Sequence, residues 1–500
     1  MKMIASFPMI LAAVLITGCQ KDPIIETEVV YETRQIHVDN PEDQVLSPFV
    51  APGFEEGHAN PVVTDGAAYL FDNGTAGIPS VYIKVSAEQW NKLLLAYDKN
   101  NRTNETVHAD MSFVKGEEAT VVLDVALSIK GNTSRRRPEG SSGSLHQSEN
   151  PNWHHAHFGL SLNKYVEGNA IGGVRKLVLK WFKDDGNYVR EMYSYDLFRR
   201  FGVWTGPEDV YTKVYIQVGK DLEPAYFGIY QMYEPYDQAY LDRRTDRFGA
   251  ADGNLWECRY GGKLTPETLP GIKHIDEAGA LYELNVTTGG FDKAKAQFTD
   301  FITNLNALEG SQFHDWIGSH MDVDLLLKTY AVNVGVGMWD DYWNNAGNNT
   351  FLYFNSQSAT DYHVYLLPHD YDNTLGTTSA VGAQTDAVTH NPYEWGPTDV
   401  TQSPLVNKIL AFDDYRAIYT KYLLELASEG GLLTYESSMQ RIGKWQEMVA
   451  VYIANDTGED MKLIDVPASW GNHPEYRVVE DGEKNFFRVK TASLLYWTAQ

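Results

Sequence analysis

Hydrophobic and polar residues alternate along several segments of the first half of the chain. This period of two is typical of β-strands, whose successive side chains point to opposite faces. It predicts a strand over residues 80–85. Apolar-rich segments over residues 119–129, 157–162 and 176–181 are predicted to be further strands, and residues 210–218 and 226–233 resemble a hairpin pair. Residues 87–97 and 188–201 have helical spacing instead, and Gly202 ends the second of these segments.

From about residue 293 the apolar residues recur every three or four positions, as in helices with one buried face. The spacing predicts helices over residues 293–308, 322–338, 404–428 and 434–454. Two short runs, residues 351–354 and 362–367, interrupt the helices and are predicted to be strands. The chain therefore has the pattern of an α+β fold, with a β-rich first half, a turn-rich middle and an α-rich second half.

The first residues have the pattern of a secretion signal. Lys2 precedes an apolar run over residues 7–16, which is too short to cross a bilayer core of about 30 Å. The Ile16-Thr17-Gly18-Cys19 segment that follows resembles the lipobox of bacterial lipoproteins, and this resemblance implies cleavage after residue 18 and lipidation of Cys19. Plain secretion, with Cys19 buried or lost, is the alternative.

Residues 19–75 contain many acidic side chains and recurring prolines, so we expect a tether rather than a folded domain there. Lys21-Asp22, directly after the lipidated cysteine, resembles a surface-export signal of some Gram-negative lipoproteins. We therefore expect an extracytoplasmic protein that is lipid-anchored to a bacterial membrane, at the outer membrane or the cell surface.

Composition narrows the classes of function. The 500 residues carry 67 acidic against 41 basic side chains, a formal charge of −26, so the overall field does not hold the chain on nucleic acid. A hydrophobic content of 43% and an aromatic content of 13% argue against disorder. Of the two cysteines only Cys258 would remain free beside a lipidated Cys19, which excludes an intramolecular disulfide.

Two polar segments in the second half carry candidate chemistry. Residues 339–349 combine Asp340 with several asparagines after a long apolar helix, and Asp370 and Asp372 follow the second predicted strand. Such oxygen-rich segments can cap helices and form turns, or they can bind a hard cation such as Mg²⁺ or Ca²⁺. The spacing after Asp370 does not match an EF-hand, because the sixth and twelfth positions are not glycine and glutamate.

The order of these residues favours a phosphotransfer site. Protein kinases place a catalytic Asp and a metal-binding Asn on one loop, then two strands, then a second, metal-binding Asp. A positive group from the β-rich half must also neutralise the nucleotide phosphates. Residues 131–137, Gly-Asn-Thr-Ser-Arg-Arg-Arg, offer N–H groups, hydroxyls and guanidinium groups that suit phosphate oxygens, although these arginines can equally pair with surface acids. The sequence has neither a Walker A motif nor a kinase GxGxxG loop.

With these residues the chain resembles the spore coat protein H (CotH) kinase family, in its lipoprotein-borne form. The resemblance covers about residues 76–460. The segments that carry it are, in chain order, Ile78-Pro79-Ser80-Val81-Tyr82-Ile83, Lys130-Gly131-Asn132-Thr133-Ser134-Arg135, Lys176-Leu177-Val178-Leu179-Lys180, Tyr226-Phe227-Gly228-Ile229-Tyr230 with Glu234, Trp339-Asp340 with Asn349-Thr350-Phe351-Leu352-Tyr353, and Pro368-His369-Asp370-Tyr371-Asp372.

The resemblance implies an atypical protein-kinase-like fold of two lobes, a β-rich lobe over about residues 76–235 and an α-rich lobe over about residues 236–500. It also implies transfer of phosphate from ATP, with Mg²⁺ or Mn²⁺, to Ser or Thr of secreted or surface proteins. Asp340 and Asn349 then match the catalytic-loop pair, and the implied metal ligands are Asp370, Asp372 and Asn349. The implied nucleotide-binding residues are Asn132, Ser134, Arg135, Lys180, Glu191 and Glu234.

Two departures from the family pattern bear on catalysis. His155 and His157 stand where family members often carry lysine or arginine, and a histidine is mostly neutral at pH 7. His369 replaces the tryptophan that usually precedes the metal-binding acid. The candidates to supply the positive charge instead are Lys180, Lys164 and the arginines of residues 135–137.

Three alternatives remain open. The histidines at positions 154, 155 and 157 could form a metal cluster. The chain could be a catalytically inactive kinase-fold lipoprotein that acts as a scaffold or in adhesion. It could also bind or process glycans, with exposed aromatics in residues 339–343 or 393–395 stacking on sugars and paired acids acting as glycosidase residues. Convergence of Asp340, Asn349 and Asp370 within reach of one metal ion, facing Arg135 across a cleft, would favour the kinase.

Overall fold

The computed structural model describes residues 49–54, 62–63, 66–72, 77–377, 386–399, 401–465 and 475–500. The predicted signal peptide, Cys19 and most of the predicted tether lie outside these residues. None of the helices in the described ranges combines enough length with enough apolar character to span a bilayer.

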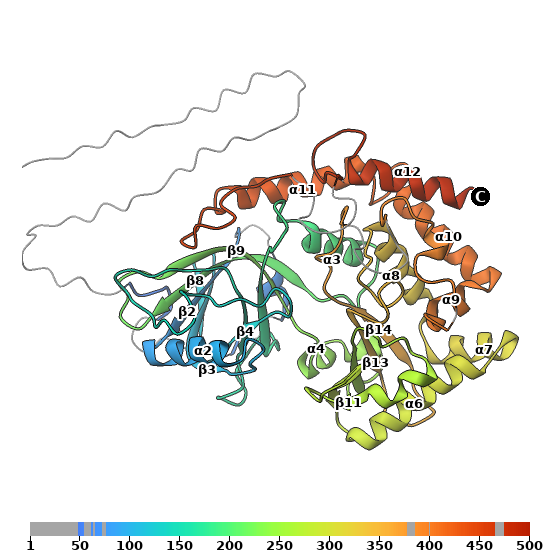
Figure 1. The fold of residues 1–500 in the computed structure, drawn as a ribbon, viewed down its shortest axis with the longest axis horizontal. Helices are drawn as coiled ribbons and strands as arrows, with labels where there is room; N and C mark the ends of the chain where they lie inside the picture. The colour runs from blue at the N-terminus through green and yellow to red at the C-terminus, as the bar shows by residue number, and fades with distance from the viewer. Residues whose placement is uncertain are drawn as a thin grey trace, which may run out of the picture.

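Seven strands of the first half close into a barrel, which forms the left part of Figure 1. In order around the barrel they are β2 (Ser80–Val85), β3 (Val107–Lys115), β4 (Glu118–Lys130), β5 (His157–Ser161), β7 (Lys176–Trp181), β9 (Ala225–Tyr233) and β8 (Asp209–Val218). Neighbouring strands are antiparallel except β2 and β8, whose parallel pairing closes the barrel. The helix α2 (Ala87–Lys99) contributes Trp90, Leu93 and Leu94 to the barrel core.

The predicted strands of the first half are confirmed, and β3 is an additional strand that was not predicted, although apolar and polar residues alternate from Val107 to Phe113. A bulge between Ala109 and Met111 shifts the register of β3 against β4. The three consecutive residues from Met111 to Phe113 are all buried, so polar Ser112 is buried as well as its apolar neighbours. Outside the barrel, β1 (Val62–Val63) and β6 (Ala170–Ile171) form a short parallel pair.

A second sheet of five strands lies in the other half of the molecule, in the order β11-β12-β10-β13-β14. Its strands are β10 (Asn254–Cys258), β11 (Ile272–His274), β12 (Tyr282–Thr287), β13 (Thr350–Phe354) and β14 (Val364–Pro368). The turn-rich middle thus supplies three strands to this sheet. Their shortness and the almost continuous burial of β10 explain why no alternation marked them.

Helices surround this sheet on the right of Figure 1. The longer ones are α6 (Phe291–Ala307), α7 (Gly310–His320), α8 (Val323–Gly335), α9 (Pro404–Leu410), α10 (Asp413–Ala427), α11 (Tyr435–Ala450) and α12 (Phe486–Thr498). The shorter ones are α4 (Gln238–Asp242), α5 (Thr245–Phe248), η1 (Pro266–Gly271) and η2 (Pro392–Glu394), whereas α1 (Ala68–Phe71) packs against the barrel through Tyr69 and Phe71. The mixture of sheets and helices confirms the predicted α+β class.

The single helix predicted over residues 404–428 is wrong, because the structure divides it into α9 and α10. Phe412 has extended backbone angles and packs against the core, and this interrupts the helical hydrogen bonds. Asp413 and Asp414 then occupy the first turn of α10, where acidic side chains stabilise the positive end of the helix dipole. Apolar spacing alone does not record such a change of direction.

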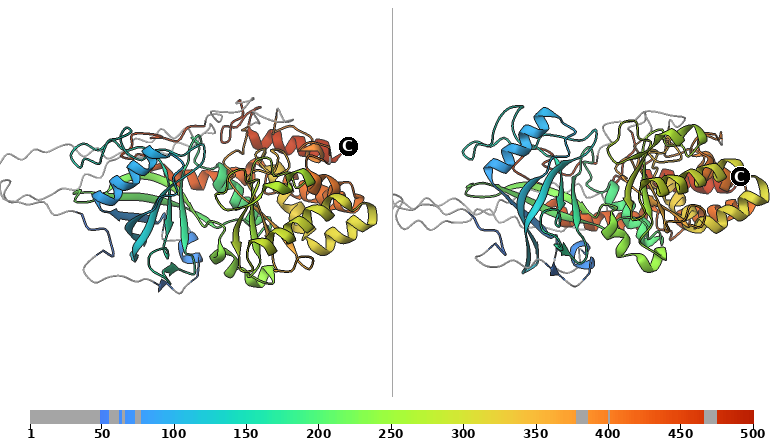
Figure 2. Two further views of the ribbon diagram at one scale, coloured as in Figure 1. Left: turned by 60° about the horizontal axis from the view of Figure 1, so that its bottom comes forward. Right: turned by 90° about the horizontal axis from the view of Figure 1, so that it is seen from below.

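The helix α3 (Arg190–Arg200) lies between the barrel and α8, and α11 runs from the helical half toward the barrel (Figure 1). Figure 2 shows the barrel and the helical half side by side along the long axis of the molecule. Segments from both halves therefore meet around α3.

Candidate active site

Lys180, near the end of β7, lies at the centre of a cluster of acidic side chains. Its Nζ atom is 2.6 Å from Glu191 Oε2 and 3.2 Å from Asp372 Oδ2, and it also pairs with Asp370. Its neighbours along β7 belong to the barrel core, so the lysine points out of the barrel. Glu191 comes from the first turn of α3, and the two aspartates come from the segment after β14. The structure thus brings four predicted site residues together.

The chain turns sharply after β14. Asp370 has a φ of 60°, in the left-handed region that aspartate adopts more readily than most residues. Its N–H donates to Tyr195 Oη (3.1 Å), and the N–H of Tyr371 donates to Glu191 Oε1 (3.1 Å). Tyr195 Oη donates in turn to Glu191 Oε1 (2.9 Å). The helix α3 therefore orients both Lys180 and the acidic turn.

The cluster holds three carboxyl groups against one ammonium group. Burial disfavours the charge of Lys180, but Asp370, Asp372 and Glu191 outweigh burial and raise the pKa of the lysine well above its usual value. Burial also opposes the charge of Asp370, but Lys180 and weaker favourable interactions prevail and lower the pKa of this aspartate to about 2. Burial and the charge of Asp370 raise the pKa of Asp372 to about 8. The cluster therefore lacks positive charge, which a divalent cation would supply.

Asp340 lies on the loop between α8 and β13, among carboxamide groups. Asn345 and Asn348 donate to its Oδ1 atom at 2.5 and 2.8 Å, and Asn373 donates to Oδ2 at 3.1 Å. Asn349 Nδ2 donates to the main-chain oxygen of Asp340 at 2.9 Å. Burial raises the pKa of Asp340, although the hydrogen bonds from the asparagines partly oppose this effect. A carboxylate held in this way is suited to accept a proton from a hydroxyl group.

Asn373 connects the Asp340 loop with the acidic turn. It follows Asp372 directly in the chain, and its amide group donates to Asp340. The charge of Asp370 contributes to the raised pKa of Asp340. Its Oδ1 atom is buried and has no hydrogen-bond partner, so it is an oxygen that a cation could use.

The described residues contain no group of three His, Cys, Asp or Glu side chains arranged as a complete metal site. Mg²⁺ commonly takes one or two carboxylates from a protein and completes its coordination with phosphates and water. The carboxylates of the acidic turn and the free oxygen of Asn373 therefore fit a cation that binds together with a nucleotide.

Ser134 and His157 form a hydrogen-bonded pair beside Lys180. The main-chain N–H of Trp181 donates to His157 Nδ1 at 3.0 Å, and His157 Nε2 lies 3.0 Å from Ser134 Oγ. Burial lowers the pKa of His157 to about 3, and the nearby charge of Lys180 contributes to this shift. The histidine is therefore neutral at pH 7, and Lys180 is the residue that supplies positive charge to the cluster.

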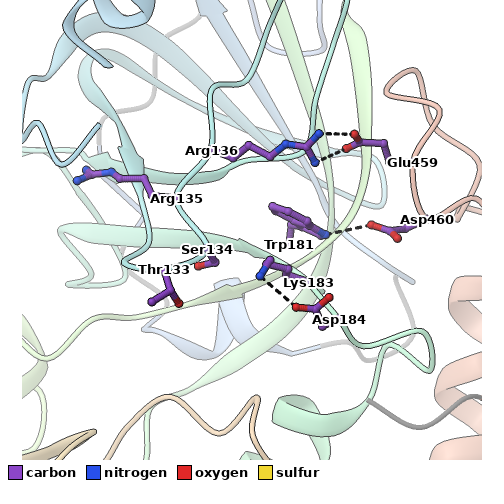
Figure 3. Close-up of a pocket in the computed structure, with 9 residues that line it drawn as sticks. All are labelled: Thr133, Ser134, Arg135, Arg136, Trp181, Lys183, Asp184, Glu459 and Asp460. Carbon is purple, nitrogen blue, oxygen red and sulfur yellow. Dashed lines mark hydrogen bonds and ion pairs between the residues drawn. The ribbon is translucent and has the colours of Figure 1, made fainter. Parts of the chain in front are cut away.

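A pocket of about 490 Å³ opens beside this pair (Figure 3). The loop after β4, the end of β7 and the segment after α11 line it. Arg136 forms two hydrogen bonds with Glu459, at 2.9 and 2.6 Å. Trp181 Nε1 donates to Asp460 at 3.1 Å, so the segment after α11 is attached to the barrel at this point.

The three arginines of the loop do not join Lys180. Arg135 points away from the other labelled side chains in Figure 3, and its guanidinium group donates to the main-chain oxygen of Ile129. Arg137 pairs with Asp98 at 2.9 Å. Asn132 lies exposed on the same loop. Of the residues that the resemblance assigned to this loop, only Ser134 is linked to the Lys180 cluster, through His157.

Glu234 does not join the cluster either. It is buried directly after β9, where the chain leaves the barrel, and it pairs with Arg243 and Arg244. It also accepts a hydrogen bond from the N–H of Glu208 at 3.1 Å. Its carboxylate therefore holds together the connection between the two halves.

The structure does not favour the metal and glycan alternatives. His155 and His157 stack on the Trp181 indole, with ring centroids 5.4 and 5.2 Å apart respectively. No three-histidine metal cluster occurs in the described part of the chain. Trp339, Trp343 and Trp395, which would have to stack on sugars at the surface, are buried in the core.

Comparison with known proteins identifies the family. A family model described as CotH kinase protein matches residues 127–478, most of the chain. The chain belongs to the CotH kinase family. No curated protein matches it. Membership implies, in general terms, a kinase-like function that uses ATP, a divalent metal and a protein substrate. All the residues of the acidic cluster and of the Asp340 loop in this CotH chain lie within the matched range.

Several residues of the CotH site were not predicted as site residues from the sequence. Asn345, Asn348 and Asn373 hold Asp340, and Tyr195 orients the acidic turn. A signal existed for Tyr195, because it follows Glu191 by four residues and therefore shares its face of α3. No spacing rule connects Asn373 with Asp340, because 33 residues and two strands separate them.

Proposed function

We propose that this chain is an extracytoplasmic, lipid-anchored protein kinase that transfers the γ-phosphoryl group of ATP to Ser or Thr hydroxyls of secreted or surface proteins. In this proposal the barrel and the part of the chain beyond about residue 235 are the two lobes of a kinase-like fold. The observation that carries the proposal is the pairing of Lys180 with Glu191 and Asp370 at an acidic turn that is hydrogen-bonded to the Asp340 loop.

The roles of the residues follow from their charge and placement. Lys180, held by Glu191, would pair with phosphate oxygens. Asp370, Asp372 and Asn349, together with the free Oδ1 atom of Asn373, would hold Mg²⁺ or Mn²⁺, and this cation would neutralise charge on the phosphates. Asp340 would accept a hydrogen bond from the acceptor hydroxyl.

In the transfer step a bond forms between the acceptor oxygen and the γ-phosphorus, and the bond from that phosphorus to the β–γ bridging oxygen breaks. The hydroxyl proton passes to Asp340, and ADP leaves with the bridging oxygen. The raised pKa of Asp340 makes it a stronger base than an exposed aspartate.

The test is incubation of the chain with γ-labelled ATP and Mg²⁺ or Mn²⁺, with the chain itself and secreted proteins as acceptors. We expect Asp340→Asn to lower labelling by about 10²-fold or more while nucleotide binding persists. Asp370→Ala should abolish labelling. Asp315→Asn is the matched control, because Asp315 lies on α7 with 86% of its side chain exposed. Absence of both nucleotide binding and labelling in the wild type would overturn the proposal.

A further inference from the structure

The hydrogen bonds of His157 determine which of its ring nitrogens carries the proton. His157 is 3% exposed, and the N–H of Trp181 donates to its Nδ1 atom at 3.0 Å. A ring nitrogen that accepts a hydrogen bond carries no proton, so the proton of this imidazole must lie on Nε2.

The same geometry determines the role of Ser134. His157 Nε2 lies 3.0 Å from Ser134 Oγ, and because this nitrogen carries the proton, the serine oxygen is the acceptor. The proton of the serine hydroxyl is then available for a second partner. Within the described residues, His157 is the only group with which Ser134 Oγ forms a hydrogen bond.

The loop is built to lie directly on the histidine ring. Gly131 has a φ of 100°, and a Cβ atom there would lie 2.9 Å from His157 Cδ2 and 3.0 Å from Ser134 Oγ. Glycine is therefore required where the loop leaves β4. This close approach places Ser134 on the wall of the pocket in Figure 3. Its hydrogen-bond partner, the His157 ring, lies close enough to Lys180 and Asp370 for their charges to affect its pKa.

We propose that Ser134 donates its hydroxyl proton to the terminal phosphates of a nucleoside triphosphate, and that neutral His157 fixes the direction of this donor. The inference rests on the proposed function and gives Ser134 and Lys180 different roles in binding phosphate. Phosphate oxygens are acceptors at neutral pH, so they suit a hydroxyl that has been oriented as a donor. The loop supplies this neutral donor, and Lys180 supplies the charge.

His157 is a positioning residue in this assignment. A protonated imidazole would have to donate from Nδ1 as well, and it could not accept the Trp181 N–H. The histidine that replaces a basic residue of the family pattern is thus a functional part of the site in its uncharged form.

Binding measurements on the full-length chain test the assignment, with ATP and adenosine as probes. We expect Ser134→Ala to weaken ATP binding about tenfold or more, since a hydrogen bond to a charged group is lost, and to leave adenosine binding unchanged. Ser141→Ala, in the exposed part of the same loop, is the matched control and should leave both affinities unchanged. Equal ATP affinity of wild type and Ser134→Ala would overturn the assignment but not the kinase proposal, whereas a wild type that binds no ATP would contradict both.

Two measurements separate positioning by His157 from a merely structural role. Asparagine at position 157 can accept the Trp181 N–H but is too short to reach Ser134. His157→Asn should therefore lose as much ATP affinity as Ser134→Ala, and the double variant should lose no more than either. His157→Gln, which retains a donor farther along the side chain, should lose less. In the wild-type chain, nitrogen-15 NMR of the histidine rings should show the Nε2–H form of His157, and a proton on Nδ1 would overturn the proposal whatever the variants do.

Discussion

At the residue scale, Lys180 shows which features of a site follow from strand alternation and which follow from tertiary contacts. Its position on β7 follows from sequence, because the residues on either side are apolar and face the barrel core. Its partners do not follow, because Glu191 is 11 residues away and Asp370 is 190 residues away. Strand periodicity determines which face of the sheet a side chain occupies, but it does not determine what lies opposite.

His157 yields a prediction about acid stability. Burial lowers its pKa to about 3 in the folded chain, against about 6.5 in the unfolded chain. Between these values the unfolded state binds more protons, so the free energy of unfolding must fall as the pH drops below 6.5, by up to about 1.4 kcal/mol per pH unit. His157→Gln should reduce this slope in urea unfolding between pH 7 and pH 4.5. His274→Gln, on the exposed edge of β11, should keep the wild-type slope, and an unchanged slope in His157→Gln would contradict the prediction.

At the scale of elements, the Asp340 loop depends on a close approach between two backbones. The N–H of Gly261 donates to the main-chain oxygen of Ala346 at 2.8 Å. A Cβ atom on Gly347, where φ is 93°, would lie 2.2 Å from the main-chain oxygen of Gly262. The turn after β10 and the loop that carries Asp340 therefore fit together only with glycine at this position.

Gly347→Ala should accordingly destabilise the fold by about 1–3 kcal/mol and lower phosphate transfer, because the Asp340 loop has to move. Gly443→Ala is the matched control. It lies within α11, where the added Cβ would meet no heavy atom within 4 Å, so alanine should stabilise the helix by about 0.5–1 kcal/mol. Urea unfolding of both variants measures these changes, and a Gly347→Ala variant as stable as the wild type would contradict the close-packing argument.

Most elements with a clear period were predicted correctly. The barrel strands β2 and β7 and the helix α6 bury one face each, so their patterns are regular. The strand β3 was missed although its apolar and polar residues alternate from Val107 to Phe113, whereas the helix predicted over residues 404–428 is divided because Phe412 packs against the core. Irregularities of this kind are decided by contacts with neighbouring elements.

At the scale of the whole molecule, the formal charge of −26 does not describe the local charge at each site. Three acidic groups gather around Lys180, and two of the three arginines after β4 are neutralised by acids rather than being open to a phosphate. The basic loop is therefore less positive than its sequence suggests. Under the proposed function, recognition of phosphate therefore depends on Lys180 and on neutral donors rather than on these arginines.

Anchoring is the prediction that concerns the whole molecule. If Cys19 carries the lipid, Cys19→Ser should release the protein from membrane fractions into the soluble fraction, because the acyl chains supply the membrane affinity. Cys258→Ser is the matched control, because Cys258 is 2% exposed within the second sheet and should leave the protein in the membrane fraction. Immunoblots of the separated fractions make the comparison. Retention of Cys19→Ser in the membrane would contradict the lipid anchor.

Sequence by itself determined the α+β class, most of the longer strands and helices, and the order of acid and asparagine residues that suggested the CotH family. It did so because local periodicity and short motifs are encoded within a few residues of one another. Only the tertiary structure decided that β2 pairs with β8, and that the guanidinium group of Arg135 binds the main-chain oxygen of Ile129 instead of joining the Lys180 cluster. It also decided that two arginines pair with Glu234, and that Ser134 forms a hydrogen bond with His157. Each of these depends on backbone direction in loops or on partners far along the chain, which no local pattern specifies.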